Sequence, residues 1–194
     1  MKLTDSIYMQ LRDEIFNAKY KPNELITERQ IAEKYCTSKL TAGEVLQRLC
    51  SEGHLTSYPR TGYMVTVLTP QEILQLNRIR VVIENLVLEI VCAECSGEEI
   101  RSLRQLIDDQ NIQGRGFAEQ NRRFHMGLAE LTHDRFIISS LMEILGSLSR
   151  VEQNFTTLFV ESWQNEHRRM VEALSQRNLE EAKKALLADL DQLA

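Results

Sequence analysis

The chain has 194 residues, of which 43% are hydrophobic and 6% are aromatic, and its formal net charge is −5. This length allows one domain or two small ones. The sequence has no apolar run of 18 residues, and residues 1–5 lack the apolar core of a signal peptide, so we expect a cytoplasmic protein with no membrane partner. Four irregularly spaced cysteines are too few for a disulfide framework.

The net charge is distributed unevenly along the chain. Residues 1–68 carry nine Lys and Arg against eight Asp and Glu, whereas residues 69–194 carry fourteen against twenty. The first part is therefore close to neutral, which excludes the broad basic field of a non-specific nucleic-acid binder. Any DNA affinity in this part would depend on a few placed cations and on the avidity of a dimer.

The first third of the chain has the pattern of a small DNA-reading domain. We predict helices over residues 6–18, 28–35 and 41–50, followed by strands over residues 54–58 and 63–67. A capping box, Thr27-x-x-Gln30, marks the start of the second helix. Residues 59–62 join the two strands as a hairpin loop. Helix, turn, helix and hairpin form a winged helix-turn-helix, whose second motif helix has the size to enter a major groove.

Motifs within this region match a known family in order and almost without gaps. They are Ile7-Tyr8-x-Gln10-Leu11-Arg12-x-Glu14-Ile15, Lys21-Pro22-x-Glu24-x-Ile26-Thr27-Glu28-Arg29-x-Ile31-Ala32, Glu44-Val45-Leu46-Gln47-Arg48-Leu49-x-x-Glu52-Gly53 and Arg60-x-Gly62-Tyr63-x-Val65. Together they resemble the GntR family of bacterial transcription regulators. The resemblance implies that double-stranded DNA is a partner. It places the DNA contacts at Arg29, Ser38, Lys39, Thr41, Arg60 and Gly62.

Three of these contact residues also have simpler interpretations. Arg29 could form a surface ion pair with Glu33, Ser38 could act only as a helix N-cap, and Arg60 could be a solvated loop charge.

The recognition helix departs from the family pattern at three positions. Family members usually have arginine at the positions of Lys39 and Gly43, and proline at the position of Thr41. Arginine binds guanine through two hydrogen bonds, whereas glycine has no side chain to do so. We therefore expect an operator that differs from the usual half-site of the subgroup.

The rest of the chain is predicted to be entirely helical. Helices are expected over residues 70–94, 98–110, 117–131, 134–150, 155–176 and 178–193, with a glycine-containing loop at 111–116. An Asn178-x-x-Glu181 capping box opens the last helix. The prediction is thus a mainly α protein, with a winged helix-turn-helix domain at residues 1–68 and an antiparallel helical bundle at residues 69–194.

The bundle contains a second group of chemically suggestive residues. Asn121 and His125 share one helical face, His167 lies on a later helix, and Asp189 lies on the last one. This pattern, with Arg80-x-x-x-Glu84 near its start, resembles the FCD effector domain of the FadR subgroup. The resemblance implies an all-helical, FCD-like bundle that binds a small organic acid, in many members through a divalent metal.

By that resemblance, Asn121, His125 and His167 match three metal ligands, and Asp189 replaces the usual last histidine. This donor set can still bind Zn, Ni or Mn, although the replacement shifts metal preference and affinity. A metal-free cavity in which the same polar groups bind the effector is the main rival. Arg80 could pair with an anionic effector, or only with Glu84 one helical turn away.

These observations favour a ligand-responsive bacterial transcription regulator. As a homodimer it would bind an approximately palindromic operator, and a small carboxylate effector would change the placement of its two recognition helices. Two alternatives remain open. A metalloenzyme could use His125, His167 and Asp189 as a 2-His-1-carboxylate site. An interaction module that no longer reads DNA is suggested by Gly43 and by the acidic second half.

Overall fold

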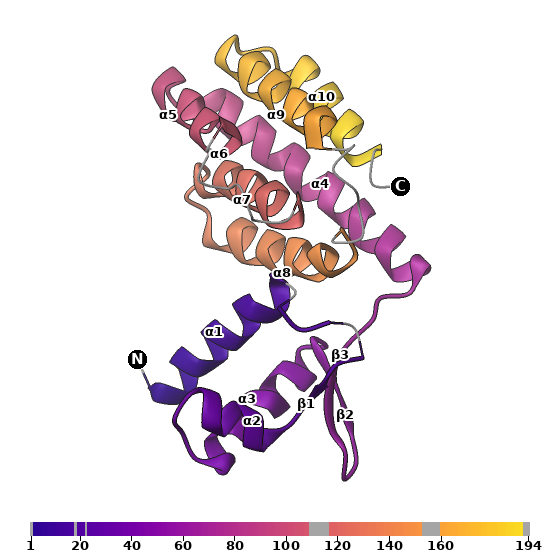
Figure 1. Ribbon diagram of the computed structural model, residues 1–194. Coiled ribbons are helices and arrows are strands. Elements are labelled where there is room, and N and C mark those ends of the chain that lie inside the picture. The colour runs from indigo at the N-terminus through magenta and orange to yellow at the C-terminus, as the bar shows by residue number, and fades with distance from the viewer. Residues whose placement is uncertain (1, 18, 22, 109–116, 153–159, 192–194) are drawn as a thin grey trace. The chain divides into compact units, whose positions relative to one another are not determined.

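The computed structural model describes residues 2–17, 19–21, 23–108, 117–152 and 160–191 (Figure 1). The chain divides into two compact units, Met1–Thr69 and Pro70–Ala194. The division lies one residue beyond the boundary expected from the sequence. None of the described helices combines the length and hydrophobicity that a membrane span requires.

The first unit is a winged helix-turn-helix, as predicted. Its elements are α1 (Leu3–Phe16), β1 (Leu25–Ile26), α2 (Glu28–Lys34), α3 (Lys39–Ser51), β2 (Leu55–Tyr58) and β3 (Gly62–Val65). The strands form an antiparallel sheet in the order β1-β3-β2, with Ile26 opposite Tyr63. The sequence did not indicate β1, because two residues are too few to show an alternating pattern. α1 begins at Leu3, three residues before its predicted start.

Local hydrogen bonds set where the two motif helices begin. The backbone N–H of Gln30 donates to Thr27 Oγ1 at 3.3 Å, and the N–H of Thr27 donates to Gln30 Oε1 at 2.8 Å, which confirms the capping box. Ser38 caps α3 by accepting the N–H of Thr41 at 3.1 Å. Behind them, α1 packs on α3 through fully buried residues such as Leu11 and Leu46. This packing holds α3 with its other face outward.

The second unit consists of helices α4 (Pro70–Glu94), α5 (Gly97–Ser102), α6 (Arg104–Asp108), α7 (Phe117–Glu130), α8 (Arg135–Glu152), α9 (Val160–Ser175) and α10 (Leu179–Asp191). The predicted single helix over residues 98–110 was wrong, because the chain breaks at Leu103. There the N–H of Leu103 donates to the carbonyl of Ile100, and the N–H of Leu106 donates to the carbonyl of Leu103. These tighter three-residue bonds interrupt the helix and leave Leu103 buried. The predicted loop at 111–116 lies outside the described residues.

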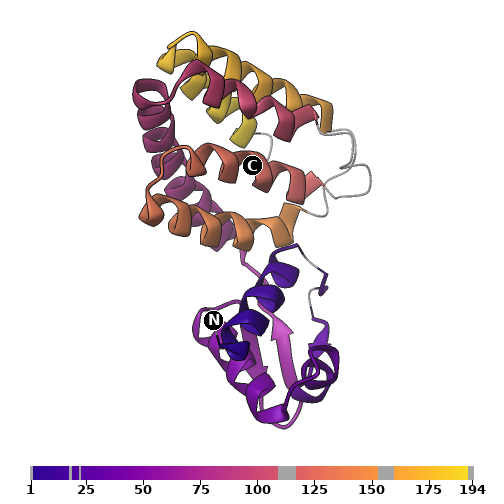
Figure 2. The same cartoon turned by 90° about the vertical axis from the view of Figure 1, so that its left-hand side faces the viewer.

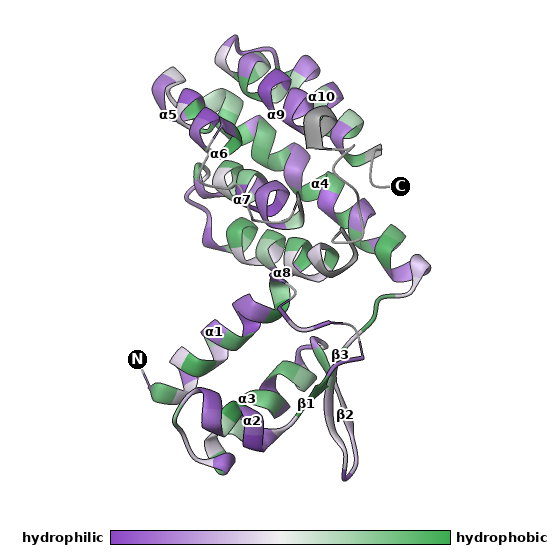
Figure 3. Ribbon diagram, in the orientation of Figure 1, coloured by the Kyte–Doolittle hydropathy of each residue, from purple (hydrophilic) through white to green (hydrophobic). Residues whose placement is uncertain are grey.

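The helices of this unit form two neighbouring pairs that share α4. In both views α7 lies beside α8, and α9 lies beside α10 (Figure 1, Figure 2). α4 contacts all four of these helices. Hydrophobic residues recur along α4 and α8, whereas the visible faces of α9 and α10 are largely hydrophilic (Figure 3). The four helices that contact α4 therefore converge around it, and polar residues among them become buried.

Two adjacent leucines on α10 test this packing. Leu186 is fully buried, whereas Leu187 is 46% exposed. We expect Leu186→Ala to lower the free energy of unfolding of the second unit by about 2–5 kcal/mol, because it leaves a cavity. Leu187→Ala should change it by less than about 0.5 kcal/mol. Denaturant unfolding of both variants, followed by circular dichroism, measures the difference, and equal effects would contradict the described packing.

Candidate functional site

The first unit has a concavity of about 380 Å³ beside the wing. Four of the six predicted DNA-contact residues line it, namely Arg29, Lys39, Arg60 and Gly62. Three of these are cations, contributed by α2, by α3 and by the hairpin loop. Cations gathered from separate elements can follow the phosphates of a nucleic-acid backbone.

The other two predicted contacts lie at the start of α3. Ser38 is its N-cap, as the simpler interpretation held, and its Oγ also lies 3.0 Å from Thr41 Oγ1. Capping does not exclude a phosphate contact, because the positive end of the helix dipole lies at the same place.

Arg29 and Arg60 differ in how they are held. Arg29 donates to Glu33 at 2.7 Å, which is the ion pair expected from the sequence, and this hydrogen bond raises the pKa of Arg29. The arginine side chain is 76% exposed. Exposed pairs contribute about 1 kcal/mol or less, so a phosphate can replace Glu33. Arg60 lies in the hairpin loop with φ 63°, in the left-handed region, and is exposed.

Two glycines near this surface have structural explanations. Gly62 has φ 139°, and a Cβ there would lie 2.7 Å from the carbonyl oxygen of Ile26. Glycine therefore permits the close approach of β1 and β3. At Gly43, a Cβ would lie 3.1 Å from Glu28 Oε1, a carboxylate oxygen that also accepts from the hydroxyl of Tyr63 at 3.4 Å. Glu28 thus covers the position from which family members extend an arginine.

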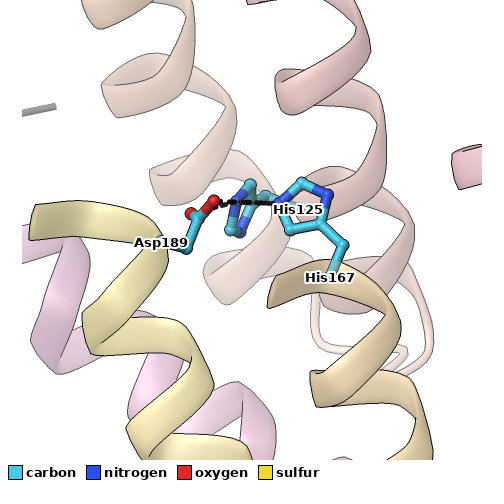
Figure 4. A group of neighbouring side chains, drawn as sticks. All are labelled: His125, His167 and Asp189. Carbon is cyan, nitrogen blue, oxygen red and sulfur yellow. Dashed lines mark hydrogen bonds and ion pairs between the residues drawn. The ribbon is translucent and has the colours of Figure 1, made fainter. Parts of the chain in front are cut away.

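The second unit buries a cluster of ionisable side chains. Its members, each no more than 3% exposed, are Arg80, Glu84, His125, His167 and Asp189. His125 on α7, His167 on α9 and Asp189 on α10 point toward one another (Figure 4). The Nε2 of His125 lies 3.1 Å from Asp189 Oδ2 and 3.2 Å from His167 Nε2, and the latter lies 3.3 Å from Asp189 Oδ1. The structure therefore brings together three of the four predicted metal ligands.

Asn121, the fourth predicted ligand, is buried on α7 one turn before His125. The sequence did not reveal two further neighbours of the histidines. Glu84 Oε2 lies 2.5 Å from His125 Nδ1, and the Phe124 ring stacks on His167 at 3.8 Å. Only the position of Glu84, in the quoted Arg80-x-x-x-Glu84 motif, hinted at the first contact.

Arg80 forms the pair with Glu84 that was the simpler of the two roles considered for it. Its Nε donates to Glu84 Oε1 at 2.6 Å, and its Nη2 lies 3.8 Å from Asp189 Oδ2. The guanidinium is therefore paired within α4 and also lies at the edge of the cluster.

Burial and neighbouring charges determine the protonation states of the two carboxylates. Burial opposes ionisation of Glu84, but His125 and Arg80 outweigh it and hold the pKa of Glu84 below its ordinary value. Burial also opposes ionisation of Asp189, and His167 and His125 hold the pKa of Asp189 well below its ordinary value. Both carboxylates are therefore ionised.

The two histidines are affected in opposite directions. Burial opposes protonation of His125, but Glu84 and Asp189 raise the pKa of His125 above its ordinary value. Burial lowers the pKa of His167 to about 4, so His167 is neutral near pH 7. The neighbouring carboxylates therefore favour the protonated form of His125, whereas burial favours the neutral form of His167.

The three facing side chains fit the ligand set of a divalent metal. Bonds of about 2.0–2.2 Å place neighbouring ligands roughly 3.3–3.6 Å apart in a tetrahedron and roughly 2.8–3.1 Å apart in an octahedron. The two imidazole nitrogens lie 3.2 Å apart, between these two ranges, and 3.1 and 3.3 Å from the two different oxygens of Asp189. Glu84 at His125 Nδ1 is the hydrogen-bond partner that a metal-bound imidazole usually has, because it fixes the tautomer that leaves Nε2 free to coordinate.

The fold and these two sites define a DNA-binding protein with a helical ligand-binding unit, and comparison with known proteins identifies its family. Residues 75–192 match the FCD domain family, and residues 3–65 match the family described as bacterial regulatory proteins, gntR family. The chain therefore belongs to the GntR family of transcription regulators and carries an FCD effector domain.

Relatives and solved structures agree with this assignment. The chain is 29% identical to the uncharacterised HTH-type transcriptional regulator YdhC of Bacillus subtilis, over 93% of this chain and 84% of that protein. It is 26% identical to the Nta operon transcriptional regulator of Aminobacter aminovorans, over 64% and 61% of the two chains. The fold matches E. coli McbR/YncC with a TM-score of 0.85 at 19% identity, over 100% and 95% of the chains. The protein is thus a DNA-binding transcription regulator, and the metalloenzyme alternative was wrong.

The wing cation Arg60 offers a test of the DNA-binding surface. We expect Arg60→Asn, which keeps a residue tolerant of positive φ, to weaken binding similarly for all sequences. The slope of log affinity against log salt concentration should fall by about one phosphate contact. Arg104→Gln is the matched control, since it removes an exposed cation that pairs with Glu172 in the second unit. Salt titrations with DNA fragments bound by the wild type measure both slopes, and an unchanged slope for Arg60→Asn would remove it from the contact set.

Proposed function

We propose that this regulator is a homodimer that binds an approximately palindromic operator under the control of a small organic acid. The acid is held together with a divalent metal in the buried cluster of the second unit. The observation that carries this proposal is the triangle of donor atoms from His125, His167 and Asp189, backed by Glu84. Because its partner is bacterial chromosomal DNA, the protein acts in the cytoplasm.

The chemistry of the donor set supports a transition metal. Two imidazole nitrogens and one carboxylate, with the Asn121 amide as a fourth ligand, suit Zn, Ni or Mn. Coordination replaces the proton on His125, because a ligating imidazole nitrogen must be unprotonated. When bound, the metal supplies a positive centre to which a carboxylate can coordinate.

The charge of the cluster supports an anionic ligand. Without a metal, Arg80 and a protonated His125 would balance Glu84 and Asp189. Exchanging one proton for a divalent metal gives the cluster one net positive charge. A monocarboxylate would restore neutrality, and the Arg80 guanidinium lies beside the site to receive it. The metal-free rival requires an anion to enter a cluster that is already balanced, which burial disfavours.

The dimer is supported by a row of exposed aliphatic residues on α4. Ile79, Val82 and Leu86 follow one another at helical spacing and are 50%, 70% and 47% exposed. A second copy could cover this row, because a helix face can pair with itself about a two-fold axis. Two recognition helices about 34–36 Å apart would then enter successive major grooves.

Metal content tests the cluster directly. Protein purified without chelator or affinity tag should contain about one equivalent of a transition metal, measured by elemental analysis. His125→Ala should lose it. His133→Asn is the control, because His133 is an exposed histidine at φ 52°, where asparagine is tolerated. If the wild type contains no metal, even after incubation with zinc, nickel or manganese, the cluster does not bind a metal and that part of the proposal is wrong.

A panel of small mono- and dicarboxylates tests the effector. At least one should raise the unfolding temperature of the metal-loaded protein and change its affinity for selected DNA fragments. A ligand at 100 times its Kd stabilises a protein by about 2.7 kcal/mol, which is a readily measured shift. The same compound should act weakly on chelator-treated protein. Equal effects on both forms would favour the metal-free cavity, and no effect of any carboxylate on either form would overturn the ligand class.

A further inference from the structure

One face of α3 is exposed along the whole length of the helix. Leu40, Glu44, Gln47 and Ser51 are exposed and follow one another at intervals of four, three and four residues. These intervals place them on one face of the helix. The opposite face is buried in the core of the first unit. This stripe, together with the exposed Lys39 and Arg48 that flank it, is therefore what α3 can present to a major groove.

The stripe contains no cation. The two basic residues of α3 are Lys39 and Arg48. Lys39 lines the concavity beside the wing. Arg48 is 48% exposed but is held by other residues, with its guanidinium 3.6 Å from the centre of the Tyr8 ring and its Nε 3.2 Å from Glu52 Oε1. Because Gly43 also adds no side chain, the stripe lacks the paired donors that recognise guanine.

Leu40 is the unusual member of the stripe. It is 76% exposed, more than any other large hydrophobic side chain among the described residues. It lies in the first turn of α3, the part of a recognition helix that contacts base edges. In the major groove, the apolar feature that a base pair offers to such a side chain is the C5-methyl group of thymine.

We propose that Leu40 contacts the methyl group of a thymine in each half-site and so determines specificity at that position. The inference rests on the DNA binding of the proposed function and adds the base that α3 selects. Covering the leucine and the methyl group together removes apolar surface from water, which gives the contact its free energy. Each buried methyl group contributes roughly fourfold in affinity, hence on the order of tenfold for two half-sites.

The test replaces thymine by uracil, which lacks only this methyl group. Random-sequence duplexes are selected with the full-length protein, and the selected pool is amplified either with thymidine or with deoxyuridine triphosphate. We expect the wild type to bind the thymine pool about tenfold more tightly. Leu40→Ser should bind the two pools with similar affinity, whereas Leu40→Met, which remains apolar, should keep most of the preference.

Gln47→Ala is the matched control, since it changes another residue of the stripe and should retain the preference for thymine. Equal affinity of the wild type for both pools would overturn the inference. The inference would also be overturned if Leu40→Ser kept the full preference for the thymine pool, because residues other than Leu40 would then contact the methyl groups. If the wild type selects no duplex at all, the proposed DNA binding fails instead, so the two failures are distinguishable.

Discussion

The arrangement of the second unit depends on charge balance inside the cluster of Arg80, Glu84, His125, His167 and Asp189. Ionised carboxylates in a protein interior are tolerated only when cations and hydrogen-bond donors compensate them. Apart from the Arg80–Glu84 pair within α4, those compensating groups come from other helices, so α4, α7, α9 and α10 must keep their relative registers. Removing one partner would leave its neighbour as an uncompensated buried charge, which costs about 3–5 kcal/mol. The residues that would hold a metal are therefore also residues on which folding depends.

The cluster also shows how a ligand could influence DNA binding. Arg80 and Glu84 belong to α4, the helix that directly follows the winged unit along the chain. A metal or an anion that rearranges the charges must change the environment of these two side chains. A ligand can shift a conformational equilibrium only by the difference in its affinity for the two states. Because α4 carries both cluster residues and the exposed aliphatic row, it is the element through which such a difference could reach a dimer.

The sequence predicted the elements better than it predicted the contacts. Helical periodicity and capping boxes located most helices, because these features depend on neighbouring residues. β1 was missed since a two-residue strand has no pattern of its own, and the break at Leu103 was missed because no glycine or proline marks it. At the buried cluster, too, the sequence indicated which residues take part better than it indicated their contacts. The positions of Asn121, His125 and His167 resembled those of a known family, whereas the contact between His125 and Glu84 joins residues 41 positions apart.

The charge of the winged unit explains why its specificity can depend on few side chains. With nine basic and eight acidic residues in its first 68, the chain has little general attraction for phosphates. Contacts to bases therefore supply a larger share of the binding free energy than they would in a strongly basic domain. Such a unit binds weakly alone, and pairing two of them raises affinity through the high effective concentration of the second. A small change in the spacing of the pair then removes much of that gain, which makes a weak reading unit well suited to control by a ligand.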